Sequence, residues 1–463
     1  MDWKDPVSQG DSGSFKDAAD HINVTIRIRP LNARELRTGG TLNAWSVQND
    51  TITQLHYHTH GRSSIGNSFT FDHIFDPQRS TKEVFNAVAQ DIIHSTMDGF
   101  NGTIFAYGQT SSGKTHTMYG IPEEPGIIDL SIRRIFERIE QTPDREYLLR
   151  VSFLEIYNEV IKDLLNPENH HLKIHEHATR GIFVGNLTEN IVMSVHDVKL
   201  LLEQGDRNRH VGETNMNDRS SRSHTIVRMV IESRERSIDE KAVEGVAATT
   251  YSGAVKVSCL NLVDLAGSER VAHTGAEGAR LREGAHINRS LLALGTVIAK
   301  LTENDGDRSN VHIPYRDSKL TRILEPSLGG NAKTAIVCTI TPASTHVEET
   351  LSTLKFANRA KNVCNKPEIN EELTGEALLR VYHKEISMLK KKLDEYRTMN
   401  GSLEIEKLTH QKMQIEEYNE EIRRQLREKE GEEARLKKHY EELKMMILDS
   451  TRLRNSDIPQ ARR

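Results

Sequence analysis

The chain has 463 residues and a net charge of −5 at pH 7, and this length suits one large domain or two ordinary ones. No stretch approaches the roughly 18 uncharged apolar residues of a membrane-spanning helix, and the first residues lack the pattern of a secretory signal, so a membrane partner is not expected. Because basic residues are not in excess, nucleic acid is not an expected partner either.

Strands and helices alternate along most of the chain. Residues 1–20 are rich in Gly, Ser and Asp and are predicted to be disordered. Beyond them, β-branched runs predict strands at 23–29, 101–107, 148–156, 255–263 and 335–340. Amphipathic periodicity predicts helices at 82–97, 127–140, 195–209, 287–301, 316–328 and 346–361. This order predicts an α/β fold, a mixed sheet with helices on both faces.

The composition changes near residue 376. Residues 376–463 hold 20 Lys and Arg and 18 Asp and Glu, with one proline and two glycines, which is typical of long surface helices. Apolar residues recur at heptad spacing in three blocks, which span 379–396, 408–425 and 436–447, and Asn400-Gly401 separates the first two. The pattern predicts a parallel coiled coil that joins two chains into a homodimer. A solvated single helix with an apolar stripe is the alternative.

Cysteine and histidine residues give no strong indication of a metal site. Cys259, Cys338 and Cys364 show no C-x-x-C spacing, which argues against a disulfide framework and favours a reducing, cytoplasmic compartment. The 21 histidines include the alternating set His56, His58 and His60 and a second group within 170–177. No carboxylate or cysteine is close to the alternating set in sequence, so exposed loops are expected rather than metal ligands.

A complete phosphate-binding loop follows the predicted strand 101–107. Its residues match G-x-x-x-x-G-K-[ST] at every fixed position. They are Gly108, Gln109, Thr110, Ser111, Ser112, Gly113, Lys114 and Thr115. The glycines let successive backbone N–H groups point at one phosphate, and the following helix N-terminus adds its dipole. We expect the Lys114 ammonium to reach the β- and γ-phosphates and the Thr115 hydroxyl to bind Mg²⁺.

Two further motifs carry phosphate-binding chemistry. Asp264 ends the predicted strand 255–263, where a P-loop nucleoside triphosphatase holds its Mg²⁺, and Gly267 follows three residues later. The segment 217–224, with sequence NDRSSRSH, offers hydroxyl, guanidinium and imidazole groups for a loop that closes over a phosphate. An ordinary strand-ending turn and a polar surface loop are the alternatives for these two segments.

Together these motifs resemble the nucleotide motifs of the kinesin motor domain, in the family's order. The matching segments are 108–118 (GQTSSGKTHTM), 217–224 and 262–270 (LVDLAGSER). Segments 315–324 (YRDSKLTRIL) and 351–360 (LSTLKFANRA) are similar to two further family signatures. The resemblance covers about residues 21–370. It divides the chain into an N-terminal extension (1–20), a kinesin motor domain (21–360), a neck linker (361–375) and a helical neck or coiled-coil segment (376–463).

The resemblance implies a microtubule-dependent ATPase that uses ATP and Mg²⁺. Arg27, Pro30 and His116 are implied to flank the adenine. The implied Mg²⁺ ligands are Thr115 and Ser221, with Asp264 one water further out, and the Gly267 N–H is implied to sense the γ-phosphate. The remaining catalytic residues are Glu269, Arg222, Ser220 and Asn217: Arg222 and Glu269 are implied to form a bridge that closes two loops, and the others to lie beside the attacking water. A bidentate carboxylate–guanidinium pair suits such a closure.

The motor part is itself acidic, so binding to acidic microtubules requires a local basic face. Arg316, Lys319 and Arg322 recur at positions that share one side of the predicted helix 316–328. Arg289, Arg270 and Arg280 are implied to join this face by the resemblance. Glu283 and Asp317 add negative charge to the same region, so ordinary, salt-dependent affinity is expected. The second histidine group falls where the family has a tubulin-facing hairpin, and protonation there is hypothesised to strengthen binding below about pH 6.5.

The order of motor and tail resembles that of plus-end-directed kinesins. Residues 361–374 resemble the neck linker, with Asn370 as its docking latch, and 370–386 resemble the neck of the centromere-associated (seventh) class. This resemblance implies movement along microtubules of the cytoskeleton, with a role in chromosome or spindle transport. A non-motile ATP-gated tether is the alternative. A depolymerising ATPase is not expected, because extra basic insertions are not seen, and a small GTPase or nucleotide kinase lacks these loop motifs.

Overall fold

The computed structural model describes residues 20–37, 44–57, 63–177, 181–211, 221–238, 249–250, 254–269, 279–303 and 312–372, and scattered positions between 390 and 438. The chain separates into two compact units, Met1–Glu372 and Leu373–Arg463. Residues 1–19, predicted to be disordered, and most heptad positions of the tail lie outside the described residues. None of the described helices is both long and apolar enough to cross a membrane.

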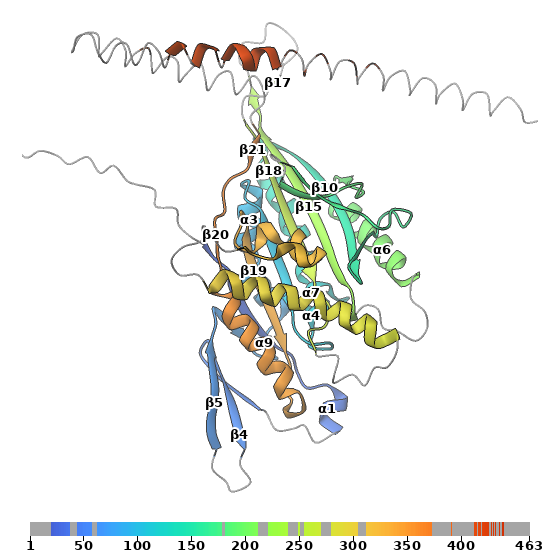
Figure 1. Cartoon of the computed structure of the whole chain (residues 1–463), viewed down its shortest axis with the longest axis vertical. Helices are drawn as coiled ribbons and strands as arrows, with labels where there is room; N and C mark the ends of the chain where they lie inside the picture. Colours follow the sequence, from blue (N-terminus) through green and yellow to red (C-terminus); the bar gives the residue numbers. More distant parts are fainter. Residues whose placement is uncertain are drawn as a thin grey trace, which may run out of the picture. The chain divides into compact units, whose positions relative to one another are not determined.

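The first unit is built on a mixed sheet, which confirms the predicted fold class (Figure 1). Its order is β11-β10-β15-β18-β7-β19-β2-β6. The bounds are β11 Val160–Asp163, β10 Arg145–Tyr157, β15 His224–Glu235, β18 Val255–Asp264, β7 Gly102–Tyr107, β19 Lys333–Ile340, β2 Asn23–Ile28 and β6 His73–Phe75. Neighbours from β18 to β6 run parallel, whereas β10 pairs antiparallel with β11 and β15, and β15 pairs antiparallel with β18.

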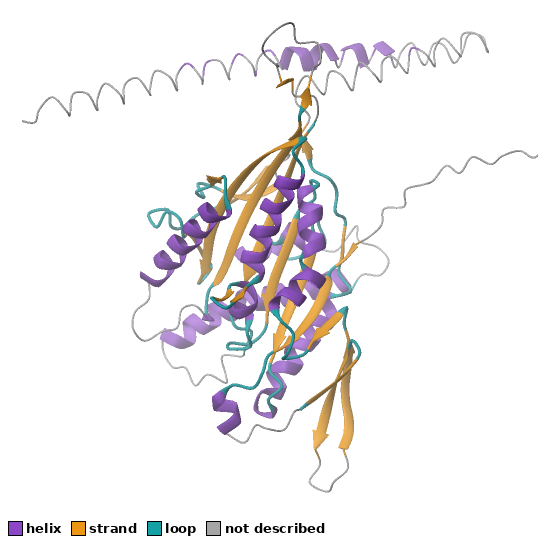
Figure 2. Cartoon of the chain, turned by 180° about the vertical axis from the view of Figure 1, so that it is seen from behind, coloured by secondary structure: helices purple, strands orange, loops and turns teal. Residues whose placement is uncertain are grey.

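Helices cover both faces of this sheet (Figures 1 and 2). One layer holds α2 Thr81–Val88, α3 Gln90–Met97, α5 Ile127–Gln141 and α6 Val195–Val211; the other holds α7 Ala279–Thr302, α8 Lys319–Ile323 and α9 Val347–Ala360. β7 shows why two layers form, because all six of its residues are buried. Phe105 and Tyr107 pack with the second layer and Ile104 and Ala106 with the first, as the alternation of a strand requires.

Two predicted helices differ from the observed ones in ways that matter for the basic face. The segment 316–328 is broken into the 3₁₀ turn η4 (Tyr315–Asp317), α8 and the 3₁₀ turn η5 (Glu325–Ser327). Pro326 lacks the N–H that a continuing helix needs and disfavours helical geometry at the preceding residue. Arg316 therefore precedes α8 and does not share a helix face with Lys319. α7 begins at Ala279, not at residue 287, so Arg280 lies on the helix and not in a loop.

The strand predictions also omit several elements. The central strand β15 was missed, although its His-Thr-Ile-Val start is β-branched. Three strands form a separate sheet, namely β3 (Trp45–Gln48), β4 (Thr51–Tyr57) and β5 (Ser63–Thr70), and β12 (Ile174–His177) pairs with β13 (Gly181–Val184). His56 lies on β4, whereas His58 and His60 lie outside the described residues. β12 and β13 have only four residues each, so their periodicity is a weak signal, whereas the omission of the twelve-residue β15 has no such explanation.

In the second unit, the described positions between 412 and 438 are helical. Ion pairs at helical spacing, Lys412 with Glu416 and Arg424 with Glu421, support this helix locally. The heptad residues Ile415 and Ile422 are partly buried. Pairing of two such helices in a homodimer stays a prediction.

Candidate nucleotide and filament site

The phosphate loop joins β7 to α4 (Lys114–Met118) through a turn that requires glycine. Gly108 has a φ of 150°, and a Cβ there would lie 2.3 Å from the carbonyl oxygen of Thr339. A side chain at this position would therefore push the loop away from β19. The same short distance shows that the loop rests directly on the carboxyl end of the sheet, where ligands bind in open α/β folds.

Side chains from distant parts of the sequence hold the loop in place. The Ser112 hydroxyl lies 2.6 Å from that of Thr339 on β19. The Arg29 Nε donates to the Ser111 carbonyl at 2.7 Å, and the same guanidinium pairs with both oxygens of Glu35 at 2.7 and 2.6 Å. The hydrogen bond from Arg29 lowers the pKa of Glu35 to about 2. Arg29 and Glu35 were not among the predicted site residues. The sequence signal that could have found them is a basic and an acidic residue on the two sides of Pro30.

Lys114 is buried at the centre of the loop. Its Nζ donates to the carbonyl oxygens of Gly108 and Gln109, both at 2.9 Å, and the residue is only 7% exposed. Burial lowers the pKa of Lys114, and the charges of Asp264 and Glu269 act in the opposite direction. A desolvated ammonium is strongly attracted to an anion, because the medium around it screens poorly. The arrangement therefore suits an anionic phosphate.

Thr115 and Asp264 meet beside Lys114 and fit a magnesium ion. The Thr115 hydroxyl donates to Asp264 Oδ2 at 2.7 Å. Asp264 is 4% exposed, and its Oδ1 has no hydrogen-bond partner among the described residues. Burial raises the pKa of Asp264, which the charge of Lys114 partly opposes. A buried, incompletely paired carboxylate beside a hydroxyl is the oxygen donor set that Mg²⁺ prefers, with waters and phosphates completing the shell. Within the described residues, no group of three His, Cys, Asp or Glu side chains is arranged around another metal position.

The loop after β18 connects the three predicted motifs through successive backbone N–H groups. The N–H of Ala266 donates to His224 Nδ1 at 3.0 Å, that of Gly267 to the Ser221 carbonyl at 2.9 Å, and that of Ser268 to the Gly108 carbonyl at 3.1 Å. A Cβ on Gly267 would lie 2.2 Å from the Thr110 hydroxyl. The segments around 108, 221 and 267 therefore meet at one place, with Gly267 against the phosphate loop. Asn217 and Ser220 lie outside the described residues.

Glu269 contacts the phosphate loop directly. Its carboxylate accepts the Thr110 backbone N–H at 2.7 Å and the Thr110 hydroxyl at 2.5 Å. The carboxylate is thus held within the first turn of the loop that is predicted to carry the γ-phosphate. The bridge between Glu269 and Arg222 stays a prediction.

The three residues implied to flank the adenine lie around α4 but differ in their surroundings. Pro30 is exposed, and His116 is partly exposed with its Nε2 3.9 Å from a Glu124 carboxylate oxygen. Arg27 is buried, and its guanidinium donates to the hydroxyls of Thr117 and Thr81 at 3.0 and 2.9 Å. Burial lowers the pKa of Arg27. Through its hydrogen bond to Thr117, Arg27 stabilises the position of α4. A direct contact between Arg27 and the adenine base stays a prediction.

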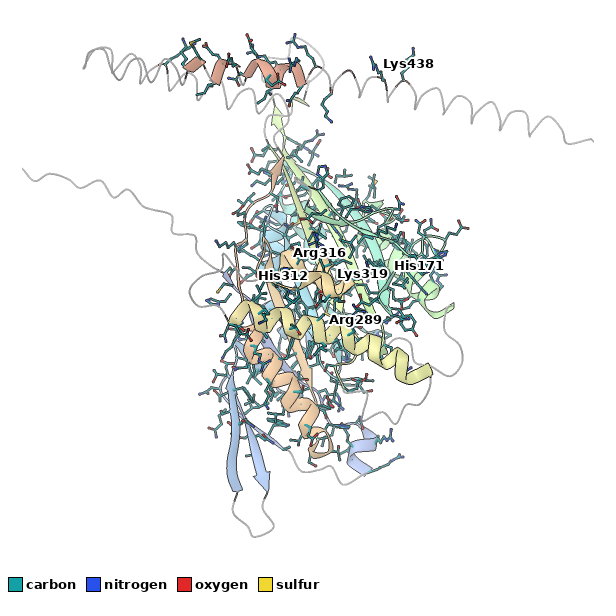
Figure 3. All side chains as sticks on the ribbon, viewed as in Figure 1. His171, Arg289, His312, Arg316, Lys319 and Lys438 are labelled. Atoms are coloured by element: carbon teal, nitrogen blue, oxygen red, sulfur yellow. The ribbon has the colours of Figure 1, made fainter. Side chains whose placement is uncertain are left out.

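The part of the predicted basic face on α8 packs beside the β12–β13 hairpin. Figure 3 labels its Lys319 together with Arg316 and Arg289. Arg316 has 76% of its side chain exposed, whereas Arg322 has 13%. The Glu176 carboxylate of β12 pairs with both, at 3.4 Å from Arg316, and Arg322 also pairs with Glu325. Arg289 is exposed on α7 and Lys319 on α8. The side chains of Arg270 and Arg280 lie outside the described residues.

Glu159 positions α8 from a turn of the sheet. Its carboxylate accepts the Ser318 hydroxyl at 2.6 Å and the Lys319 N–H at 2.7 Å, which satisfies one of the free donors at the helix start. The Ser318 side chain in turn accepts the Leu320 N–H. These contacts fix the start of α8, and with it Lys319, against the turn between β10 and β11.

The segment after α9 lies along the sheet. β20 (Cys364–Asn365) pairs with β1 (Asp20–His21), and β21 (Glu371–Glu372) pairs with β18. The Asn370 backbone and side-chain N–H groups donate to the Gly99 carbonyl at 3.0 and 3.1 Å, and its Oδ1 accepts from Asn331 at 2.9 Å. Asn365, which the sequence analysis missed, is buried and bonds the carbonyls of Ser327 and Ala332 at 3.1 and 2.7 Å.

Comparison with known proteins agrees with this geometry. The family model "Kinesin motor domain" matches residues 27–363. The chain is 48% identical over 426 residues to kinesin-like protein KIN-7N of Arabidopsis thaliana, covering 92% of this chain and 49% of that protein. It is 50% identical over 377 residues to centromere-associated protein E of Homo sapiens, covering 81% of this chain and 13% of that protein. The chain thus spans half or less of these two relatives.

Solved structures show the same fold. A structure described as that of a fast kinesin has a TM-score of 0.66 at 41% identity and covers 76% of this chain and 95% of that chain. A KIF14 dimer with AMP-PNP, in complex with a microtubule, has a TM-score of 0.68 at 37% identity and covers 78% and 100%. The phosphate loop, the Thr115–Asp264 pair and the loop that carries Gly267 and Glu269 all lie within the matched residues. The chain belongs to the kinesin motor domain family, whose members are microtubule-stimulated ATPases.

Proposed function

We propose that this chain is a microtubule-stimulated ATPase that moves toward microtubule plus ends. The observation that carries the proposal is the meeting of three sequence-distant segments at one end of β7 and β18. There Lys114 bonds the Gly108 carbonyl, Thr115 bonds Asp264, and Gly267 bonds the Ser221 carbonyl. The direction, the neck-linker mechanism and a mitotic transport role rest on the resemblance, and the similarity to centromere-associated protein E supports the last.

The site residues support hydrolysis mainly by positioning and charge. Lys114 and the loop N–H groups hold the phosphates, and Thr115, Ser221 and Asp264 are the residues that would hold Mg²⁺. When bound, this ion neutralises charge that develops on the β- and γ-phosphates. The Gly267 N–H, which bonds the Ser221 carbonyl in this structure, would turn toward the γ-phosphate, and closure of the Glu269–Arg222 bridge, with Asn217 and Ser220, would order the attacking water. Such positioning contributes much of the rate in phosphoryl transfer.

The proposal is tested by ATP hydrolysis with and without stabilised microtubules, followed by gliding of polarity-marked microtubules on surface-bound protein. Strong stimulation and gliding with the minus end leading are expected. Activity that microtubules do not stimulate would remove the filament from the mechanism. Stimulation without gliding would instead support the non-motile tether.

We propose that docking of residues 361–375 supplies the movement. In the structure, Asn370 has four hydrogen bonds, to Gly99, Val257 and Asn331, which we take as the docked arrangement. Each of these hydrogen bonds contributes about 0.5–1.5 kcal/mol net. The free energy of docking is therefore small enough for the bound nucleotide to switch the segment between docked and undocked states.

Asn370→Ala is expected to slow microtubule gliding by roughly threefold or more while the stimulated ATPase rate changes by less than about twofold. The variant loses only the side-chain bonds to Gly99 and Asn331, each contributing about 1 kcal/mol. Gliding velocity and phosphate release, measured on the same preparation, check this. Asn362→Ala is the matched control, because the side-chain hydrogen bond of Asn362 is a local one, to the Asn358 carbonyl. Equal gliding by both variants would contradict the latch role.

The filament partner is proposed to contact Arg289, Arg316 and Lys319, together with Arg270 and Arg280. Arg322 belongs to this face by position, but its guanidinium is covered and paired with Glu176 and Glu325. Glu176 therefore reduces the positive charge that the face presents to an acidic surface.

Glu176→Gln is expected to lower the half-saturating microtubule concentration about two- to fivefold, because it removes an anion from the face and frees Arg316. The difference should shrink as ionic strength rises, since exposed charges are screened. Co-sedimentation at two salt concentrations checks it. Glu137→Gln on α5 is the control, because it removes one charge from the opposite helical layer. Unchanged or weaker binding by Glu176→Gln would show that Glu176 does not oppose the filament.

A further inference from the structure

His224 is a buried titratable residue that the proposed chemistry does not use. It begins β15, directly after the loop that carries Ser221 and Arg222, and is 2% exposed. Its Nδ1 accepts the Ala266 N–H at 3.0 Å, and its Nε2 lies 2.7 Å from the Ser290 hydroxyl on α7. Both ring nitrogens therefore have hydrogen-bond partners, one on the loop after β18 and the other on α7.

The protonation state of this imidazole follows from its partners. Because Nδ1 accepts an N–H, a neutral ring carries its proton on Nε2 and donates it to Ser290. Burial lowers the pKa of His224 to about 3, so the ring is neutral at physiological pH. Hydrogen bonds of this kind are directional, so they constrain the relative positions of the groups they join.

The two ends of this link have different tasks. Ala266 precedes Gly267, whose N–H bonds the Ser221 carbonyl and must turn away from it to reach a γ-phosphate. Ser290 is 3% exposed on the inner side of α7, next to Arg289, which is exposed on the proposed filament face (Figure 3). Leu265 and Leu291 belong to the same hydrophobic cluster, to which this loop and α7 both contribute.

We propose that the His224–Ser290 pair is the positioning link through which binding of α7 to a microtubule moves the Ala266–Gly267 backbone at the γ-phosphate. Small helix shifts of about 1–2 Å are a common form of such coupling. Apolar packing is non-directional and tolerates sliding, whereas the paired hydrogen bonds through His224 are directional and do not. His224 acts through the backbone of its neighbours and touches no reacting atom. The inference rests on the microtubule-stimulated activity proposed above.

The test compares Ser290→Ala and His224→Asn in the full chain. Ser290→Ala removes the hydroxyl at the helix end of the link, and alanine is well suited to a helix. His224→Asn keeps an acceptor near the position of Nδ1 for Ala266 but does not reach Ser290. Thr296→Ala is the control, because that α7 hydroxyl bonds the Leu292 carbonyl of its own helix. Basal ATPase, stimulated ATPase against microtubule concentration, and melting temperature are measured for each variant.

We expect Ser290→Ala to keep the basal rate and the half-saturating microtubule concentration within about twofold and to lose about tenfold in the stimulated kcat. His224→Asn should lose at least as much of the stimulated kcat, and the double variant should be no slower than His224→Asn, because both changes remove the same link. Full stimulation of either folded variant, or parallel loss of the basal and stimulated rates in Ser290→Ala, overturns the inference. If the melting temperature of one variant is far below that of the wild-type protein, the stimulated kcat of the other variant is used to judge the inference. A wild-type protein without stimulation overturns the proposed function itself, and with it this inference.

Discussion

Replacing Lys114 with alanine is expected to lower ATP hydrolysis at least about 100-fold, with and without microtubules. Lys114 is the buried cation of the phosphate loop, held against two of its carbonyl oxygens. Without it, the charge of the β- and γ-phosphates faces Asp264 and Glu269, whose charges already interact with Lys114. Binding of a fluorescent ATP analogue, together with steady-state phosphate release, measures the effect.

Two variants separate charge from general damage in this experiment. Lys114→Arg keeps the charge but places a planar, forked group where a compact ammonium fits, so it should also fail. Lys355→Ala removes an exposed lysine from α9 and should be neutral. Melting temperatures confirm that each variant is folded. Hydrolysis by Lys114→Ala above about a tenth of the wild-type rate would place the nucleotide elsewhere.

Replacing Glu269 with alanine is expected to lower the microtubule-stimulated kcat at least about 100-fold while nucleotide still binds. The carboxylate holds both the N–H and the hydroxyl of Thr110, which places it beside the loop that binds the γ-phosphate. Its loss removes an interaction needed for closure rather than the phosphate cradle itself. A large loss of kcat with little change in the KM for ATP is the expected signature. Glu303→Ala, an exposed residue directly after α7, is the control.

Further variants identify which contact of Glu269 matters. If its main task is the predicted bridge, Arg222→Ala should cause the same loss, and the double variant should lose no more than either single variant. If its main task is to hold the phosphate loop, Thr110→Val should reproduce the loss and Arg222→Ala should not. A Glu269→Ala protein that microtubules stimulate normally would remove Glu269 from the mechanism.

The site could be predicted from the sequence wherever its chemistry is carried by contiguous residues. The phosphate loop is one unbroken run of eight residues, and spacing alone predicts the roles of its glycines, lysine and threonine. Asp264 and Gly267 were placed by the end of an apolar strand. The alternation of long strands and amphipathic helices likewise predicted the mixed sheet with two helical layers, because each pattern reports which side of an element is buried.

The predictions were wrong where a local signal competed with periodicity. The amphipathic pattern of 316–328 predicted one helix, yet Ser318 caps α8 and Pro326 ends its extension, so the helix has only five residues. The pattern described a buried side correctly, since Leu320, Thr321 and Ile323 are buried. The amphipathic pattern did not indicate where the helical backbone hydrogen bonds begin and end. As a result, the charged residues of this segment lie on two different elements.

By itself, the sequence determined the family, the sheet, the phosphate loop and the order of the motifs, because these depend on neighbouring residues and on fixed periods. Only the tertiary structure decided the contacts between distant residues: Arg29 with Ser111, His224 with Ser290, and Glu176 with Arg316 and Arg322. These partners are separated by 82, 66, 140 and 146 positions. Their pairing depends on how the strands align and where the helices pack on the sheet, and no periodicity within one segment encodes that arrangement.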